Sequence, residues 1–211
     1  MARFPLALSA HPSAWTADAE TGKPGAVAAV ATCQFCGQPT AGWQEPFHLN
    51  DDHADDSAAN IASSCPLCHL PQHLNRPDID REAVLIWLPE MAQGAVNVLA
   101  RQIHLTCKAN GLTPVYEDLA RRSSAVISTS AAYHAYRTLF ERTAAADLRL
   151  GTTSPRHLGA ALRELPSPDY ERRSALLGGI RLLPIGRLFH HGRDIYPDML
   201  RDWAPPSRPP A

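Results

Sequence analysis

Cys33-Gln-Phe-Cys36 and Cys65-Pro-Leu-Cys68-His69 are the two stretches that decide the fold of this 211-residue chain. Each Cys-x-x-Cys turn directs two thiolates toward one point, and two such turns joined by a loop complete the tetrahedral shell that zinc prefers. We therefore predict one structural Zn²⁺ ion held by Cys33, Cys36, Cys65 and Cys68. Disulfide pairing and a dithiol redox centre are the alternatives that the same residues leave open.

The composition is that of a globular protein with little net charge. Apolar residues make up 45% of the chain and charged residues 19%, and the net charge is -1. A protein that grips duplex DNA usually carries a basic field, so we expect no strong nucleic-acid binding. Zinc thiolates fit a reducing compartment, and neither a secretory signal nor a membrane-spanning run is recognisable, so we expect a cytoplasmic protein. We expect the fifth cysteine, Cys107, to be a small buried residue.

The loop between the cysteine pairs carries His48 and Asn60, and the second pair continues into His69. The order and spacing of these residues resemble the core segment of HNH (ββα-metal) nucleases. In active members of that family a histidine is the general base, the residue before it binds the catalytic metal, an asparagine fixes the loop and a distal histidine is a further ligand. The resemblance places His48 on the base, Asn60 on the loop-fixing asparagine and His69 on the distal ligand.

Phe47 occupies the position of the missing metal ligand, and a phenyl ring cannot coordinate a cation. The metal stabilises the leaving oxygen and the phosphate charge, whereas a histidine base alone supplies about 10²–10⁴-fold. We therefore expect no working catalytic residue, with His48, Asn60 and His69 vestigial. Asp51, Asp52 or His53 remain alternative ligands. A purely structural role is the other alternative: His48 and Asn60 would hydrogen-bond the loop, and His69 would brace the knuckle. We expect His190 and His191 to lie at the surface.

The hydrophobic pattern predicts an α+β fold with a mainly helical C-terminal half. The resemblance implies that the first part of this fold is a zinc-knuckle HNH-like ββα core. We expect a zinc-binding domain over 1–110, a helical region packed on it over 111–200, and a flexible proline-rich tail over 201–211. Strands are predicted at 4–8, 26–32, 44–49 and 83–88, helices at 65–75, 90–110, 116–122, 130–148, 155–165 and 168–177, and irregular structure at 182–196.

Beyond the second cysteine pair, the stretch Ile86-Trp-Leu-Pro-Glu90 and the helix that carries Asn97 and Arg101 resemble the IcmJ (DotN) family of type IVB (Dot/Icm) secretion systems. The resemblance implies a non-catalytic adaptor that binds the C-terminal region of the type IV coupling ATPase, beside other coupling-complex adaptors, and aids substrate recruitment. It also implies a cytoplasmic subunit that is peripheral to the inner membrane, with membrane association only through its partners.

Two other functions remain as alternatives to the adaptor. One is an active HNH endonuclease that cleaves DNA with a divalent metal, and the other is a zinc-ribbon DNA-binding factor, which the low charge disfavours. Four tryptophans are large side chains of a type enriched at interfaces, although Trp87 lies in an apolar run and is equally a core residue. They are Trp15, Trp43, Trp87 and Trp203.

Overall fold

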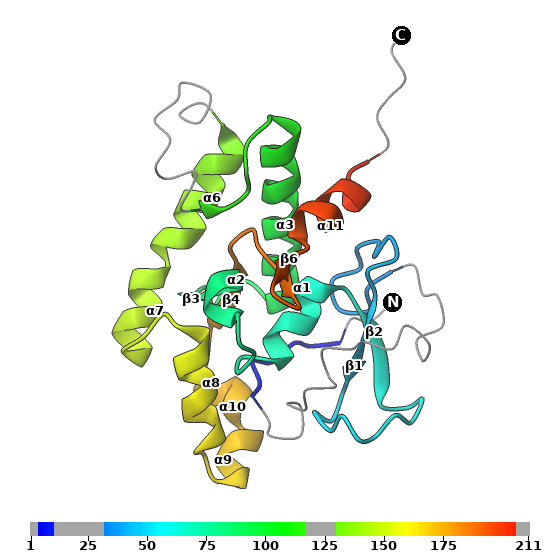
Figure 1. Cartoon of the computed structure of the whole chain (residues 1–211). Coiled ribbons are helices and arrows are strands. Elements are labelled where there is room, and N and C mark those ends of the chain that lie inside the picture. The colour runs from blue at the N-terminus through cyan, green and yellow to red at the C-terminus, as the bar shows by residue number, and fades with distance from the viewer. Residues whose placement is uncertain (1–3, 11–31, 117–129, 206–211) are drawn as a thin grey trace.

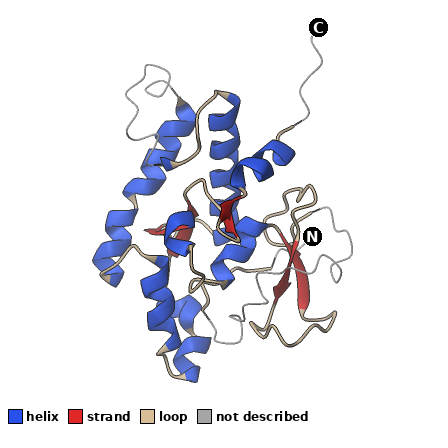
Figure 2. Ribbon diagram, viewed as in Figure 1, coloured by secondary structure: helices blue, strands red, loops and turns tan. Residues whose placement is uncertain are grey.

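Small antiparallel sheets and short helices make up the protein, as Figures 1 and 2 show. The computed structural model describes residues 4–10, 32–116 and 130–205. The mixed content of helices and strands confirms the predicted α+β class. No helix among the described residues is long and apolar enough to cross a bilayer.

The strands of the described residues pair in three two-stranded sheets. These are β1 (Glu45–His48) with β2 (Ile61–Ser64), β3 (Ala83–Trp87) with β4 (Ile180–Pro184), and β5 (Phe189–His190) with β6 (Arg193–Asp194). The helices are α1 (Pro66–His69), the 3-10 turn η3 (Leu70–Gln72), α2 (Ile79–Glu82), α3 (Gln93–Ala109), α6 (Ala131–Glu141), α7 (Thr143–Leu150), α8 (Pro155–Arg163), α9 (Ser167–Glu171), α10 (Arg173–Leu176) and α11 (Tyr196–Trp203).

The β1–β2 hairpin and α1 follow one another directly in the chain, which confirms the strand predicted at 44–49 and the helical segment predicted at 65–75. The hairpin pairs Glu45 with Ser64 and His48 with Ile61. Pro66 opens α1 at the first helical turn, where its missing N–H costs nothing. This order places α1 against both strands of the hairpin (Figure 1).

The strand predicted at 4–8 is wrong, because residues 4–10 form no strand. The segment nevertheless makes backbone hydrogen bonds, in which Ser9 donates to Pro71 O over 2.8 Å and Leu74 donates to Ser9 O over 3.1 Å. Its neighbour there is a helical turn rather than an extended strand, so no ladder can form. The strand predicted at 26–32 and the helix predicted at 116–122 lie almost wholly outside the described residues.

The predicted strand at 83–88 is confirmed as β3, but the prediction of irregular structure over 182–196 is wrong. In the ladder Leu85 lies opposite Leu182, and Trp87 lies opposite Ile180. The chain then forms the β5–β6 hairpin and α11. The predicted loose tail begins too early, because Trp203 is buried in α11 and donates to Thr40 O over 2.9 Å.

The helices predicted at 90–110 and 155–165 are confirmed as α3 and α8. Ser154 caps α8 by accepting from His157 N, as a serine before a helix start is expected to do. The two other predicted helices are each broken into two. The segment at 130–148 divides at Arg142 into α6 and α7, and the segment at 168–177 divides at Arg172 into α9 and α10.

Helix α3 is the central element of the described chain, because it contacts α1, α6, α11 and β4. Its Gln93 side chain donates to Leu182 O over 2.7 Å and accepts from Leu182 N over 2.8 Å. Farther along, His104 Nδ1 lies 2.6 Å from the Tyr196 hydroxyl. The division into residues 1–110 and 111–200 stays a prediction, although one hydrophobic core joins Cys33 and Trp203.

Candidate metal centre and the adjoining histidine cluster

The four paired cysteines converge on one buried point. Their Sγ atoms all lie within 4.8 Å of one another, and the Sγ atoms of Cys36 and Cys65 are 3.8 Å apart. A Zn–S bond of about 2.3 Å gives a tetrahedron whose edge is about 3.8 Å. A disulfide needs an S–S distance of about 2.05 Å, and all five cysteines are free. The arrangement therefore fits a tetrahedral metal ion and not a disulfide.

The backbone of each turn fixes two of the thiols in place. In the first turn Gly37 takes a φ of 72° and donates to Cys33 O over 2.9 Å, so the chain reverses directly after Cys36. In the second turn, Cys65 is the N-cap of α1, and the backbone N–H of Cys68 donates to Cys65 O over 2.9 Å. These short-range hydrogen bonds shape each turn, and the Gln34–Ser63 hydrogen bonds tie the first turn to β2.

Without a cation the thiols compete for protons. Hydrogen bonds from Cys36, Cys65 and Cys68 hold the pKa of Cys33 far below its usual range. The same contacts with Cys33 and Cys36, together with burial, raise the pKa of Cys65. Four thiols this close can all ionise only if a cation compensates their charge. The chemistry of the donor set is therefore that of a thiolate-bound metal.

Helix α3 supplies polar groups around the cysteines. Asn97 Nδ2 donates to Cys68 Sγ over 3.3 Å and to Leu67 O over 2.9 Å. The Arg101 side chain donates to Pro39 O over 2.8 Å and stacks on Trp203, 4.0 Å from the ring centroid. Burial lowers the pKa of Arg101, and the charge of Cys65 and Cys36 opposes that shift. A guanidinium is thus placed to offset part of the negative charge of a four-thiolate centre.

Phe47 lies in the core beside this centre. It is 7% exposed, and its ring centroid is 4.4 Å from that of Phe35 and 6.0 Å from that of His69. The side chain that replaces the expected ligand is therefore used for packing, and it brings a carbon surface toward His69 in place of a donor atom.

His48 is buried at the end of β1, and its Nδ1 atom has no hydrogen-bond partner among the described residues. Its Nε2 atom lies 3.2 Å from Asp56 Oδ1, and its ring stacks on His53 with centroids 4.2 Å apart. Its backbone carbonyl accepts from Gln72 Nε2 over 2.6 Å. The imidazole is thus oriented by a carboxylate of the same loop.

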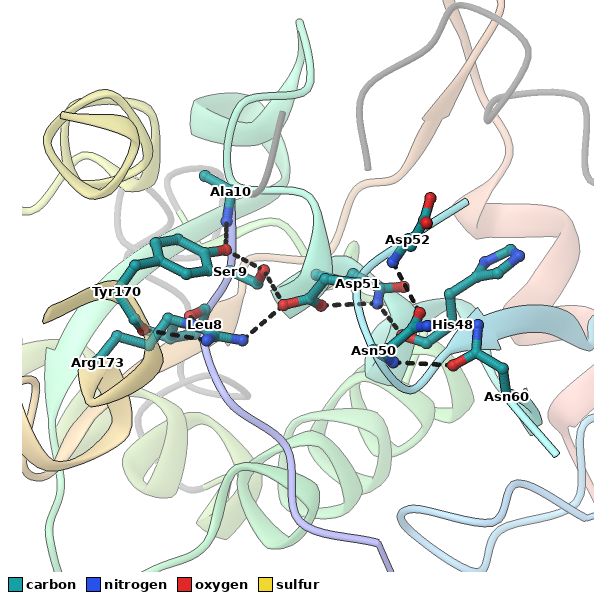
Figure 3. A network of polar contacts seen from close by, with 11 residues as sticks. Leu8, Ser9, Ala10, His48, Asn50, Asp51, Asp52, Asn60, Tyr170 and Arg173 are labelled. Atoms are coloured by element: carbon teal, nitrogen blue, oxygen red, sulfur yellow. Dashed lines mark hydrogen bonds and ion pairs between the residues drawn. The ribbon is translucent and has the colours of Figure 1, made fainter. Parts of the chain in front are cut away.

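Asn60 closes the loop that follows His48, as Figure 3 shows. Its Oδ1 atom accepts from Asn50 N over 2.9 Å, and its Nδ2 atom donates to Asp55 O over 2.8 Å. Its carbonyl also accepts from Leu49 N over 2.9 Å. These bonds define a closed histidine loop over residues 49–60, held at both ends by one asparagine.

His69, at the end of α1, takes part in two strong side-chain contacts. Its Nδ1 atom lies 2.8 Å from Glu45 Oε2, and its Nε2 atom lies 3.1 Å from His73 Nε2. Sequence reasoning missed His73, although its spacing of four from His69 is the spacing of neighbours on one helical face. Glu45 was missed as well, since only the hairpin register places it beside the end of α1.

His53 completes a cluster of four histidines with His48, His69 and His73. Its ring lies edge-on to His73 with centroids 5.1 Å apart. Burial, together with the positive charge of His48 and His69 when protonated, lowers the pKa of His53 to about 4. His53 is therefore neutral near pH 7, which is the form in which an imidazole can bind a metal.

Asp51 anchors the histidine loop to the rest of the molecule (Figure 3). Its Oδ2 atom accepts from Arg173 Nη2 over 2.6 Å and from Ser9 Oγ over 3.0 Å, and its Oδ1 atom accepts from Gln72 over 3.0 Å. Tyr170 lies 2.7 Å from the same Ser9 hydroxyl. The residue adopts a φ of 62°, so the backbone itself turns here to reach the anchor.

The remaining predicted residues lie elsewhere. His190 and His191 are exposed, with ring centroids 4.2 Å apart, and Cys107 is fully buried on α3. Trp203 is a core residue, whereas Trp43 and Trp87 are half-buried. Trp15 lies outside the described residues.

Fold and site together define a small α+β protein with a buried four-cysteine centre and a histidine cluster beside it. No protein-family model matches the chain. The chain is 25% identical over 157 residues to a curated protein, the Type 4 apparatus protein DotN of Legionella pneumophila subsp. pneumophila (strain Philadelphia 1). The match covers 72% of this chain and 66% of DotN, just under two thirds of its length. It confirms the resemblance to the IcmJ (DotN) family.

Proposed function

We propose that this protein is a non-catalytic adaptor subunit of a type IVB secretion or conjugation coupling complex. One structural Zn²⁺ ion, bound by the four paired cysteines, stabilises it. It binds the C-terminal region of the coupling ATPase beside other adaptors and aids the recruitment of substrates. It is cytoplasmic and peripheral to the inner membrane through that complex.

The observation that carries this proposal is the match to a type IV apparatus protein over 72% of the chain. A match of that extent involves most of the folded molecule and not a zinc knuckle alone. That relative is named as a component of an apparatus, and a component acts by binding its neighbours. The coupling ATPase as the particular neighbour follows from the family resemblance.

An HNH-like origin for the core is part of the same proposal. The order β1, β2, α1 is that of a ββα unit, with His48 ending β1, Asn60 just before β2 and His69 ending α1. Phe47 leaves this unit without the ligand that precedes the base. The scaffold is therefore retained for binding, and its stability depends on the cysteine-bound ion.

Co-purification with the coupling ATPase of the same secretion system tests the adaptor role. The full chain, co-expressed with a tagged C-terminal region of that ATPase, is expected to elute with it as a stable complex. The His48→Ala variant should still associate, because His48 has no role in binding, whereas Cys36→Ser should not, because the fold is lost. Failure of a well-folded wild-type chain to associate would contradict the proposal.

The histidine cluster favours a second function enough to require a test, namely metal-dependent DNA cleavage. Supercoiled plasmid incubated with the full chain and magnesium, manganese or nickel should remain uncut. Nicking that disappears in His48→Ala would overturn the non-catalytic assignment, since a contaminating nuclease would not respond to that substitution.

A further inference from the structure

A cavity lies where the histidine loop meets the helices α8, α9 and α10. Its volume is about 460 Å³, within the range of about 300–1,000 Å³ that small-molecule sites usually have. The histidine loop contributes Asn50 and Asp51 to the lining, and α10 contributes Arg173. Among the described residues, the lining contains neither a histidine nor a cysteine, so this space is separate from the metal centre.

Hydrogen bonds hold the buried part of the lining in place, as Figure 3 shows. Arg173 Nη2 donates to Asp51 Oδ2 over 2.6 Å, and Arg173 Nη1 donates to Tyr170 O over 3.2 Å. The guanidinium carbon of Arg173 lies 4.3 Å from the centroid of the Tyr170 ring. The Tyr170 hydroxyl lies 2.7 Å from Ser9 Oγ and accepts from Ala10 N over 3.2 Å. These groups are ordered before a ligand arrives, so binding does not have to order them.

Two leucines give the cavity an apolar wall. Leu162, near the end of α8, is buried, and Leu165, in the connection to α9, is half-buried. Both belong to the main hydrophobic core or pack against it, so their positions are fixed by the fold. An apolar group placed against them would be removed from water, which favours binding.

Three exposed polar side chains of the lining have no protein partner. Arg163 ends α8, Ser167 begins α9 and Glu171 ends α9. None of these side chains makes a hydrogen bond or an ion pair within the part of the chain that the structure describes. The two other charges of the lining, Asp51 and Arg173, pair with each other. The cavity therefore offers one unpaired cation, one unpaired anion and one hydroxyl beside an apolar wall.

We propose that this cavity binds a small zwitterion with an apolar body, which is the chemistry of an apolar dipeptide with free ends. The ligand carboxylate pairs with Arg163, and the ligand ammonium pairs with Glu171. The apolar side chains of the ligand cover Leu162 and Leu165, and Ser167 supplies a further hydrogen bond. A singly charged ligand would leave one of the two charges unmatched, whereas a zwitterion matches both. This site goes beyond the adaptor function and does not depend on it.

Calorimetric titration of the full chain with the dipeptide leucyl-leucine tests the site. The wild type should bind one equivalent with saturable heat. Arg163→Gln and Glu171→Gln should each weaken binding about three- to tenfold, because each removes one exposed ion pair with the ligand. Arg172→Gln is the matched control, since Arg172 is exposed, pairs with Asp169 and lies outside the lining. Absence of saturable binding to the wild type would overturn the proposal.

Two capped dipeptides assign each ligand charge to its partner. N-acetyl-leucyl-leucine lacks the ammonium, so the wild type and Glu171→Gln should bind it equally, while Arg163→Gln should bind it more weakly. Leucyl-leucine amide lacks the carboxylate, so the wild type and Arg163→Gln should bind it equally, while Glu171→Gln should bind it more weakly. Capped dipeptides that bind the wild type as tightly as leucyl-leucine would show that the cavity does not recognise a zwitterion.

Discussion

Single side chains decide the chemistry of this centre more than the backbone does. Phe47, at the position where the HNH resemblance expects a metal ligand, packs on Phe35 in the core. Two residues away along β1, Glu45 keeps its carboxylate on His69. Phe47 thus contributes packing in place of a donor atom, while His69 keeps its polar contact with Glu45.

Replacing one ligand thiol should unfold the cysteine centre. A structural zinc contributes on the order of 10 kcal/mol, comparable to the whole stability of a domain, which is about 5–15 kcal/mol. Cys36→Ser or Cys65→Ser should therefore lose the bound zinc, become less soluble and melt at a markedly lower temperature. Cys107→Ser is the control, since Cys107 is buried on α3 and is not part of the four-cysteine group. Metal analysis and thermal melting measure both effects, and an unchanged melting temperature in Cys36→Ser would contradict a structural metal.

His104 should make the protein sensitive to acid. Burial lowers its pKa to about 3, whereas in the unfolded chain the ordinary value is about 6.5. Between these values the unfolded state binds more protons, so stability falls as the pH falls, by up to about 1.4 kcal/mol per pH unit. His104→Gln keeps an acceptor for Tyr196 but cannot titrate.

Denaturant unfolding at pH 6.5 and 5.5 separates the two proteins. The wild type should lose about 1 kcal/mol more than His104→Gln over this step. His134→Gln should behave as the wild type, because His134 is exposed on α6. An equal loss in wild type and His104→Gln would mean that His104 accepts a proton in the folded state.

The ligand cysteines, His48, Asn60 and His69 can be found in the sequence because their spacing is short and their chemistry is local. The contacts around them cannot, because they depend on tertiary structure. The Asp51–Arg173 ion pair joins positions far apart in the chain, so no local sequence pattern predicts it. His73 differs from these, because its spacing of four residues from His69 is visible in the sequence.

At the scale of elements, the histidine loop is coupled to α10 through one ion pair. Asp51 and Arg173 are 12% and 15% exposed in their side chains, so water screens them little. A double-mutant cycle with Asp51→Asn and Arg173→Gln should give a coupling energy of about 1–3 kcal/mol. Asparagine tolerates the positive φ of residue 51, so the substitution tests the charge and not the backbone.

The same cycle on Asp169 and Arg172 is the control. Those side chains are 40% and 69% exposed, and their coupling should stay below about 0.5 kcal/mol. Equal coupling energies for the two pairs would show that Asp51 does not anchor the loop.

Alanine substitutions at two glycines, Gly186 and Gly192, distinguish the cost of backbone strain from the cost of steric overlap. Gly186 and Gly192 both have positive φ values, 87° and 75°. A Cβ atom at Gly186 would overlap the Pro114 carbonyl, whereas one at Gly192 would meet nothing within 4 Å. Gly192→Ala should therefore cost about 1 kcal/mol from strain alone, and Gly186→Ala about 3 kcal/mol or more. Chemical denaturation measures both values, and equal costs would place Gly186 away from Pro114.

These breakers also explain which elements were missed. The segment that follows α10 contains Pro184, Gly186 and Gly192. Proline and glycine residues spaced this closely usually indicate loops. The strand β4 forms because Leu182 and Leu183 pair with residues of β3. Helix α11 forms because Tyr196 and Trp203 pack into the hydrophobic core. Elements this short are selected by tertiary partners, whereas long periodic segments such as α3 were predictable from the sequence alone.

At the scale of the molecule, helix α3 and the β3–β4 ladder make the two halves interdependent. A shortened chain of residues 1–110 would lose β4, the Leu182 partner of Gln93 and the Tyr196 partner of His104. We expect that chain to lack a cooperative unfolding transition, while a chain of residues 1–205 retains one. Thermal melting by circular dichroism compares them, and a cooperative 1–110 fragment would establish an independent zinc domain.

The β3–β4 ladder also sets an order of events during synthesis. The four paired cysteines leave the ribosome early, so their thiols can bind a metal ion while most of the chain is still being made. The apolar strand Ala83–Trp87 must then wait for Ile180–Pro184, which is translated much later. Until that moment the β3 edge that pairs with β4 stays open in the nascent chain, so it is exposed to wrong pairing for most of synthesis.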